Sequence, residues 1–403
     1  MNSRQLTTRE CPVCGGIQHL RLARQEFSAL SAGSLMTGYD VVVCQHCGTG
    51  FADGLPSQEA FNKYYAQMSK YEHQDTDGQE APVDLERFGA VVEMVERYLP
   101  DRAAAIADVG CATGGLLAAF RAEGYANLLG IDPSAVCVRY VRDRGLKALL
   151  GTVLALTASS DRFDLIMFSM VLEHLVDPGG VLSSVWARLN EGALVYVQVP
   201  DVTGFARFLD APFQQFSTEH INFFSPQSLT NLMAKHGFEE VAIQQQVFAQ
   251  STLTFMPAVS ALYRRSSAPP PIAHDQDTQT ALAHYLDASQ RLQRRIAETI
   301  AQFVAEQTPL LIWGVGTHTL RLLATTSLGE ANIVAFVDSN PHYQGKELAD
   351  RPILAPESIQ GLMDPILISS CVLQEEIARQ ISTQLYYDNK LIRLYGREGV
   401  DSL

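Results

Sequence analysis

Short apolar runs that alternate with helical stretches dominate the middle of the chain. Residues 106–120 read as an apolar strand, a glycine-rich turn and an apolar helix, and a second strand ends at Asp132. Further apolar runs at 163–169 and 192–201 are separated by another helical stretch. Buried strands that alternate with helices are typical of a sheet with helices on its faces. We therefore predict an α/β domain at residues 81–260.

A second α/β pattern occupies the C-terminal part of the chain. Apolar residues recur at intervals of three or four from Tyr285 to Phe303, which predicts a long helix with one packed stripe. A strand, a glycine turn, a helix and another strand follow over 309–348. The proline- and serine-rich stretch 265–279 is typical of a linker. We assign the linker, the long helix and this α/β unit to a third domain at residues 261–403.

The N-terminal segment carries a different signal, because its pattern is one of cysteines. Cys11 and Cys14 stand in CPVCGG, and Cys44 and Cys47 stand in CQHCGTG. A two-residue gap lets both thiolates face one ion, and the glycine after each pair permits a tight return of the backbone. The spacing predicts a zinc ribbon within residues 1–80. Four thiolates complete a tetrahedral shell, so we interpret the zinc as structural.

Two other interpretations of the cysteine pairs remain open. One is a redox dithiol, which is usually found in a βαβ context that this segment lacks. The other is a zinc site in which His19 or His46 replaces one of the cysteines. The matching spacing of the two pairs favours a site built from all four thiolates.

Composition and charge argue against nucleic acid and membranes as partners. The formal net charge is −14 at pH 7, which works against binding to a phosphate backbone. The N-terminus has no apolar core of signal-peptide length, and no window further on is apolar over the length of a membrane span. We expect a cytoplasmic protein without nucleic-acid or membrane partners. A monomer and a homodimer are both compatible with the sequence.

A glycine-rich turn after the first central strand predicts a ligand site. Asp108, Gly110 and Gly114 form an acidic-x-Gly-x-x-x-Gly pattern, and Asp132 ends the next strand. The glycines let a ligand approach the main chain where the helix starts, and the second acid can accept both ribose hydroxyls. A dinucleotide fingerprint needs a glycine that this turn lacks, and Asp108 would repel a pyrophosphate. Because Asp108 suits the ammonium of a methionine moiety, we predict S-adenosylmethionine as the ligand.

The expected cofactor contacts extend beyond this turn. Val153 and Leu154 are expected to sandwich the adenine ring without an acidic hydrogen-bond partner. The predicted cofactor-binding residues are Asp108, Gly110, Cys111, Ala112, Thr113, Gly114, Asp132, Pro133, Val153, Leu154 and Ser169.

The C-terminal α/β unit repeats this plan. Gly314 and Gly316 follow its first strand, and Asp338 follows its second strand. A glycine turn and a strand-end acid at this separation are typical of nucleotide binding, although Gly-x-Gly-x-x-Thr alone is a weak signal. We predict a second nucleotide-type site at these three residues.

From residue 88 to residue 250 the chain resembles the class I S-adenosylmethionine-dependent methyltransferases. The resemblance rests on DVGCATG, on the strand-end acid of NLLGID, and on FDLI and EHLVDP, which occur in the same order. It implies a Rossmann-like sheet for the central domain.

The whole chain is similar to the sugar C-methyltransferases of deoxysugar biosynthesis. The similarity rests on the two cysteine knuckles, DVGCATG, TEHINFFS and VDSNPHYQGKEL. It implies an N-terminal zinc module, a central S-adenosylmethionine module and a second Rossmann-like domain at the C-terminus. It also implies a nucleotide-linked keto sugar between the last two modules. One turn departs from the family, because this chain reads GVGTHT in place of Gly-x-Gly-Ala-x-x-Lys-Gly.

The resemblance also implies a set of catalytic residues. The Glu-His pair of the family maps onto Glu219 and His220, its active-site tyrosine onto Tyr71 and its second histidine onto His174. We interpret His220 as the base that removes a proton beside the ketone, because a neutral imidazole suits this task near pH 7. Glu219 is assigned to a sugar hydroxyl. Tyr71 and His174 are assigned to the developing enolate oxygen.

Three phenylalanines flank this Glu-His pair. We expect Phe216, Phe223 and Phe224 to bury the His220 ring and to keep it neutral. Without the resemblance, a histidine in such a stretch is more often a packed structural residue.

Two other functions remain open at this point. One is an O- or N-methyltransferase acting on a sugar or a small metabolite, in which His220 would deprotonate a hydroxyl or bind an amine. The other is a non-catalytic scaffold that binds S-adenosylmethionine and docks a partner protein through its C-terminal unit. The intact glycine turn and the Glu-His pair favour an enzyme.

Overall fold

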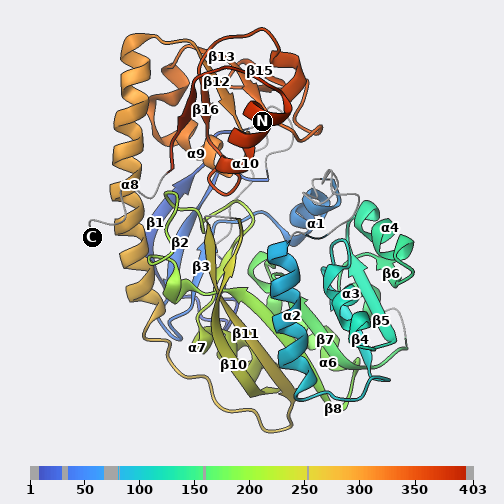
Figure 1. Cartoon of the computed structure of the whole chain (residues 1–403). Coiled ribbons are helices and arrows are strands. Elements are labelled where there is room, and N and C mark those ends of the chain that lie inside the picture. The colour runs from blue at the N-terminus through green and yellow to red at the C-terminus, as the bar shows by residue number, and fades with distance from the viewer. Residues whose placement is uncertain are drawn as a thin grey trace.

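The computed structural model describes residues 9–29, 35–67, 80, 82–157, 160–251 and 254–395. Their strands form three sheets of seven, four and six strands (Figure 1). In this described part of the chain, no helix is both long enough and apolar enough to cross a membrane.

The seven-stranded sheet is built from the apolar runs of the central region. Its order is β10-β11-β8-β7-β4-β5-β6, and all neighbours are parallel except at β11. The strands are β4 (Ala105–Val109), β5 (Asn127–Asp132), β6 (Lys147–Leu150), β7 (Phe163–Ser169), β8 (Leu189–Pro200), β10 (Phe238–Ala249) and β11 (Phe255–Arg265). The helices of this region are α2 (Pro82–Glu96), α3 (Gly115–Ala122), α4 (Ala135–Asp143), α5 (Leu154–Thr157), α6 (Pro178–Trp186) and α7 (Pro226–Lys235).

Both faces of this sheet are buried. Along β7, Leu165 and Met167 belong to one hydrophobic cluster, whereas Ile166 and Phe168 belong to another. Successive side chains of a strand point to opposite faces, so the two clusters are the two sides of one sheet. The predicted α/β fold of the central region is confirmed.

The four-stranded sheet combines the N-terminal segment with a piece from the middle of the chain. Its antiparallel order is β1 (His19–Glu26), β2 (Gly38–Cys44), β3 (Gly50–Asp53) and β9 (Asn222–Phe223), and α1 (Gln58–Gln67) follows β3. β9 pairs with β3 through Gly50 opposite Phe223 and Phe51 opposite Asn222. The segment after β8 therefore leaves the central sheet and joins the N-terminal one.

The C-terminal part contains the predicted long helix and a third sheet. Helix α8 (Thr278–Glu306) runs along one side of the molecule, past the N-terminal and the C-terminal sheets (Figure 1). The sheet order is β14-β15-β13-β12-β16-β17, parallel except for the pair of β14 and β15. Its elements are β12 (Leu310–Trp313), α9 (Thr317–Thr325), β13 (Ile333–Val337), β14 (Glu347–Leu348), β15 (Arg351–Leu354), β16 (Ile366–Ile368), α10 (Gln374–Arg379) and β17 (Leu391–Arg393).

The segment expected as a linker is fixed to the rest of the molecule at its C-terminal end. Asp275 is 1% exposed, and its carboxylate accepts hydrogen bonds of 2.6 Å from the hydroxyls of Ser225 and Thr278. The amide of Asp275 donates to the Cys47 carbonyl at 2.9 Å. The start of α8 is thereby joined to the second cysteine knuckle.

A single hydrophobic cluster unites α8, the N-terminal sheet, the C-terminal sheet and the segment before β9. Within it, the ring of Phe216 lies 4.8 Å from that of Phe223 and 5.1 Å from that of Tyr285. Tyr285 also accepts a hydrogen bond of 2.8 Å from the amide of Gln215. The segment that leads to the Glu-His pair is therefore held by α8.

Arg321 on α9 holds the same segment from the C-terminal domain. Its side chain is buried and donates to the carbonyls of Pro212 and Phe216. We expect Arg321→Met to lower the free energy of unfolding by about 1–3 kcal/mol, because two buried carbonyls lose a charged donor. Urea denaturation measures this change. Arg321→Lys should recover part of the stability, and a methionine variant as stable as the native protein would contradict the expectation.

Candidate active site

The glycine turn after β4 packs closely against its neighbours. Gly110 and Gly114 have φ angles of 76° and 84°, in the left-handed region that favours glycine. A Cβ atom on Gly110 would lie 2.7 Å from Val171 Cγ2, and one on Gly114 would lie 2.9 Å from Val141 Cγ2. The turn thus needs glycine at both positions. The contact with Val171 also brings the segment after β7 against this turn.

Asp132 at the end of β5 closes the turn from the other side. Its carboxylate accepts hydrogen bonds from the amide of Ala112 at 2.9 Å and from that of Ser134 at 2.8 Å. Burial raises the pKa of Asp132, and these two amides act against the rise. Each carboxylate oxygen keeps a lone pair for a further donor such as a ribose hydroxyl.

Asp108 near the end of β4 is a buried acid. It is 3% exposed, and within the described residues its Oδ1 has no hydrogen-bond partner. Burial and the nearby Asp132 raise the pKa of Asp108 to about 8, and Arg87 opposes the rise. Arg87 donates to Ser169 Oγ at 3.1 Å and to Gln198 Oε1 at 3.0 Å, at the ends of β7 and β8. A buried acid that lacks a donor fits a cationic ligand group such as an ammonium.

We expect Asp108→Asn to stabilise the cofactor-free protein increasingly as pH rises from about 4 to about 8. The folded pKa of about 8 lies above the ordinary value of 3.8, so folding favours the protonated acid. The stability that the protonated acid contributes is complete below pH 4 and is lost as pH rises through about 8. Asparagine does not ionise, and its advantage at pH 8 should be on the order of 5 kcal/mol.

Urea denaturation of the cofactor-free native and variant proteins at pH 5 and pH 8 tests this prediction. Asp143→Asn is the matched control, because Asp143 is exposed at the end of α4. An Asp108→Asn effect of the same size at both pH values would contradict the raised pKa.

The other predicted cofactor residues surround this turn at different depths. Cys111 and Thr113 are buried, and Thr113 donates to Glu80 at 3.0 Å. Val153 is buried in the core beneath the sheet, whereas the Leu154 side chain is 63% exposed. Pro133 is half-buried. The structure therefore places these residues around one sheet edge, with Leu154 at the surface.

The Glu-His pair at 219–220 lies in a tight turn. The hydroxyl of Ser217 accepts hydrogen bonds from the amides of Glu219 at 3.2 Å and His220 at 3.0 Å. Tyr39 on β2 donates to the Ser217 carbonyl at 3.0 Å. This turn therefore fixes the backbone of both residues from the N-terminal sheet.

A second Glu-His pair follows β7 and packs against the first. The amide of Ile221 donates to the carbonyl of Glu173 at 2.9 Å, and Nδ1 of His174 lies 3.1 Å from the carbonyl oxygen of Glu219. The rings of His174 and His220 meet edge to face, 4.9 Å apart. Since Val171 touches Gly110, His174 lies on the segment that borders the glycine turn, and His220 packs against this segment through its contact with His174.

Two tyrosines of α1 complete this cluster. The hydroxyl of Tyr64 donates to Glu219 Oε1 at 3.0 Å, and that of Tyr65 lies 3.0 Å from His174 Nδ1. The family resemblance instead maps the active-site tyrosine onto Tyr71, which lies outside the described residues. The helical spacing of Phe61 with Tyr64 and Tyr65 would have indicated that both tyrosines share the inner face of α1.

Arg9 is a further residue that sequence reasoning missed. Its guanidinium donates to the carbonyls of Ile221 at 3.2 Å and Val176 at 2.5 Å, and to Asn222 Oδ1 at 2.8 Å. Burial lowers the pKa of Arg9 to about 10. The residue joins the first knuckle to both Glu-His segments, and no local pattern in the sequence marks it.

The three phenylalanines do not form the expected wall around His220. Phe216 and Phe223 belong to the hydrophobic cluster around α8, whereas Phe224 belongs to the cluster beneath the central sheet. The expectation was wrong because residues 223 and 224 turn to opposite sides of an extended segment. His220 is half-buried and packs against the ring of His174.

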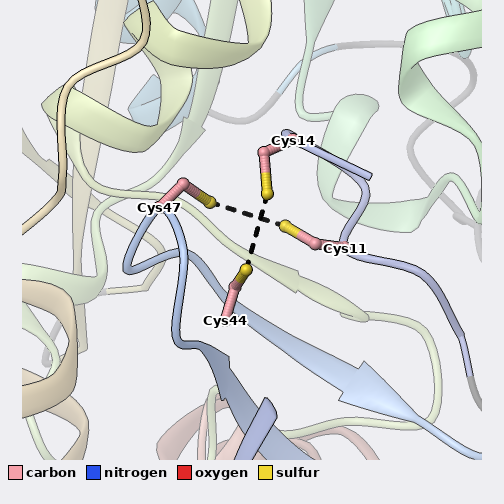
Figure 2. Close-up of side chains that lie close together, drawn as sticks. All are labelled: Cys11, Cys14, Cys44 and Cys47. Atoms are coloured by element: carbon pink, nitrogen blue, oxygen red, sulfur yellow. Dashed lines mark hydrogen bonds between the residues drawn. The ribbon is translucent and has the colours of Figure 1, made fainter. Parts of the chain in front are cut away.

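The four N-terminal cysteines converge as predicted. Figure 2 shows their sulfur atoms pointing toward one another. The Sγ atoms of Cys11 and Cys47 lie 3.6 Å apart, and those of Cys14 and Cys44 lie 3.5 Å apart. Sulfur ligands of a tetrahedral zinc ion lie roughly 3.8 Å apart, because each zinc to sulfur bond is about 2.3 Å. The donor set and spacing therefore fit a structural zinc ion.

The end of β13, like the end of β5, carries an aspartate that accepts hydrogen bonds from two backbone amides. Asp338 accepts hydrogen bonds of 2.8 Å from the amides of Val315 and Asn340, as Asp132 does from its turn. Gly314 has a φ angle of 107°, and Gly316 is exposed just before α9. Burial, Asp338 and Glu219 raise the pKa of Tyr343 to about 12. Tyr343, in the loop after Asp338, also packs against the hydrophobic cluster that contains Phe216 and Phe223.

Two families of known proteins match the chain. Residues 83–243 match the methyltransferase domain family. Residues 306–392 match the family described as C2185-like, N-terminal. The first match runs from α2 into β10, and hence covers the glycine turn and both Glu-His pairs.

Individual relatives are also methyltransferases. A C-methyltransferase, NovU, of Streptomyces niveus is 24% identical over 378 residues, which cover 87% of each chain. A ubiquinone biosynthesis O-methyltransferase of Methylobacterium nodulans is 28% identical over 106 residues, or 25% of this chain and 42% of the relative. The crystal structure of an S-adenosylmethionine-dependent methyltransferase of Methanosarcina mazei has 16% identity and a TM-score of 0.37, covering 43% of this chain and 97% of that chain. The chain is an S-adenosylmethionine-dependent methyltransferase.

Proposed function

We propose that this enzyme methylates a carbon atom of a keto sugar that is linked to a nucleotide. The main support is the packing of His174 against His220, with His174 three residues after Val171, which contacts Gly110 of the glycine turn. The similarity to a C-methyltransferase over 87% of both chains favours carbon as the methyl acceptor. The sugar and its nucleotide rest on the motif resemblance and on the strand-end acid Asp338 near Tyr343.

The residues around the glycine turn would hold the cofactor. Asp108 is the acid available to the ammonium, and Asp132 keeps lone pairs for the ribose hydroxyls. When bound, S-adenosylmethionine supplies an electrophilic methyl group. Loss of the acid in Asp108→Asn should therefore weaken its binding, in contrast to the gain in stability of the cofactor-free protein.

The proposed base is His220. A carbon beside a ketone becomes nucleophilic when a base removes its proton and the electron pair moves toward the ketone oxygen. The backbone of His220 is fixed by Ser217, and its ring packs edge to face against that of His174, which limits the positions open to the base. Glu219 is bound by Tyr64 through one carboxylate oxygen and keeps the other for a sugar hydroxyl.

We assign the donor to the enolate oxygen to Tyr65 rather than to His174. The carbonyl oxygen of Glu219 can only accept, so its contact with His174 assigns the imidazole proton to Nδ1. A neutral His174 then has an acceptor at Nε2 and no proton there to donate. Burial, Glu219 and Tyr64 raise the pKa of Tyr65 well above its ordinary value, which keeps its hydroxyl protonated.

Hydrogen exchange in heavy water tests the proposed reaction. The protein is incubated with S-adenosylhomocysteine and a panel of nucleotide-linked keto sugars. Deuterium is expected to enter the carbon next to the ketone without methyl transfer, and the exchange should be lost in His220→Asn. With S-adenosylmethionine, mass spectrometry and carbon NMR should then locate the methyl group on that carbon. A methyl group on oxygen and no exchange would favour the O-methyltransferase alternative and overturn the proposal.

A further inference from the structure

Three side chains of types that can ligate a metal lie close together at the candidate active site, apart from the cysteine cluster. Glu173, His174 and His220 each present one ligand atom, and these atoms lie within 4.8 Å of one another. Glu173 is 1% exposed, and the two histidines are half-buried. Two imidazoles and one carboxylate are a ligand set that divalent transition metals prefer over magnesium or calcium.

The measured separation within this group fits a metal ion. His174 Nε2 lies 3.7 Å from Glu173 Oε1. Two ligand atoms at this separation, each about 2.1 Å from an ion, subtend an angle of roughly 120° at it, within reach of tetrahedral geometry. Three protein ligands leave one coordination position open.

The position of the proton on the His174 ring also fits a metal site. Its Nδ1 proton is directed to the Glu219 carbonyl at 3.1 Å, so Nε2 is the nitrogen that presents a lone pair toward Glu173. Metal-binding histidines usually donate their other ring proton to a carbonyl or carboxylate, which fixes the ring and raises its basicity. His174 therefore has the outer hydrogen bond of a metal ligand.

The backbone that carries the three ligands is also fixed. The Ile221 amide donates to the Glu173 carbonyl at 2.9 Å, and the His220 amide donates to Ser217 Oγ at 3.0 Å. These bonds hold the two Glu-His segments in register with each other. Little rearrangement beyond side-chain rotation is needed to bring the three ligand atoms around one ion.

We propose that Glu173, His174 and His220 form a binding site for a divalent transition-metal ion, and that the bound ion inhibits methyl transfer. The ion occupies the imidazole lone pair of His220, which the base needs in order to accept a proton. Metal binding and base action are then mutually exclusive at this residue. The inhibitory half of the proposal rests on the proposed function of His220, whereas the binding half does not.

Titration with Co²⁺ tests the binding half. The probe is the full-length protein with its cysteine site already loaded with zinc, titrated with CoCl₂ and followed by visible absorption. We expect one Co²⁺ per chain with weak ligand-field bands and without the thiolate charge-transfer band that cobalt in the cysteine site would give. Glu173→Gln and His220→Asn should each weaken Co²⁺ binding by at least about 10-fold. His236→Asn is the matched control, since His236 lies at the end of α7 and contacts Ser183.

Each outcome of the titration decides the binding half. Equal Co²⁺ binding by the native protein and His220→Asn would overturn it, as would spectra that show only thiolate ligation. Circular dichroism and zinc content verify that each variant is folded. If the buried Glu173→Gln variant fails this check, His220→Asn and His174→Gln carry the test.

The inhibitory half is tested separately by activity. At the Co²⁺ concentration that saturates the optical signal, methyl transfer is expected to fall at least about 10-fold and to recover after brief treatment with EDTA, because the base is blocked. Unchanged activity with the site fully occupied would overturn inhibition while the optical result still establishes the site. Failure of the proposed function appears differently, as absence of carbon methylation in metal-free assays.

Discussion

Replacing His220 by asparagine is expected to lower kcat for methyl transfer by about 10²- to 10⁴-fold, the range that a positioned general base contributes. Asparagine keeps hydrogen-bonding groups near the same place but cannot accept a proton near pH 7. Asp108 and Asp132, which would hold the cofactor, lie on other strands, so cofactor affinity should stay close to the native value. Product mass spectrometry measures kcat, and calorimetry measures cofactor binding.

Two comparisons separate loss of a base from loss of structure. His236→Asn should retain the native rate, because His236 lies at the end of α7 and contacts Ser183. In His220→Gly, added imidazole should restore part of the rate, since a free base can enter the space of the missing ring. A His220→Asn enzyme with native kcat would exclude this residue as the base.

The central sheet could be predicted because its signal is local and repeated. Runs such as β7 and β8 are apolar at nearly every position, since both of their faces are buried. The strand-end acids were equally visible, and Asp132 and Asp338 each accept two backbone amides from the adjoining turns. Both the buried strands and the strand-end acids can be recognised from a few neighbouring residues.

The surroundings of His220 could not be predicted, because they depend on contacts between distant segments. β9 has two residues, which is too short for a periodic signal, and it pairs with β3 more than 160 positions earlier in the chain. That pairing sends Phe223 and Phe224 into different cores. The phenylalanines at 216–224 therefore pack into two separate hydrophobic cores, and the ring that packs against His220 is that of another histidine.

The polar residues that hold the site were missed for the same reason. Tyr65 reaches His174 from α1, Arg9 reaches Ile221 from the first knuckle, and Arg87 reaches Ser169 and Gln198 from α2. None of them stands in a motif, because each acts on a partner far away in the sequence. Only the folded chain shows these contacts.

We predict that the cysteine site holds zinc and that loss of this metal disables the enzyme through β3. The second knuckle, with Cys44 and Cys47, connects β2 to β3, and β3 pairs with β9, which begins two residues after His220. Structural zinc contributes about 10–16 kcal/mol of apparent binding free energy in zinc-finger peptides, so loss of one thiolate in Cys44→Ser should cost several kcal/mol. The β3 edge would then no longer hold β9, and the His220 turn would lose its support.

We therefore expect Cys44→Ser to lose its zinc, to unfold at a lower temperature and to lower kcat at least about 10-fold, the scale of effect seen when support around a metal site is lost. Cofactor binding should change less than kcat, because the glycine turn belongs to the central sheet and not to the sheet of β3 and β9. Elemental analysis, thermal unfolding and calorimetry measure these three quantities. Cys371→Ser is the matched control, since Cys371 is also buried but lies outside the cluster. A zinc-free Cys44→Ser enzyme with native kcat would show that β9 holds its place without the metal, and would separate the cysteine site from catalysis.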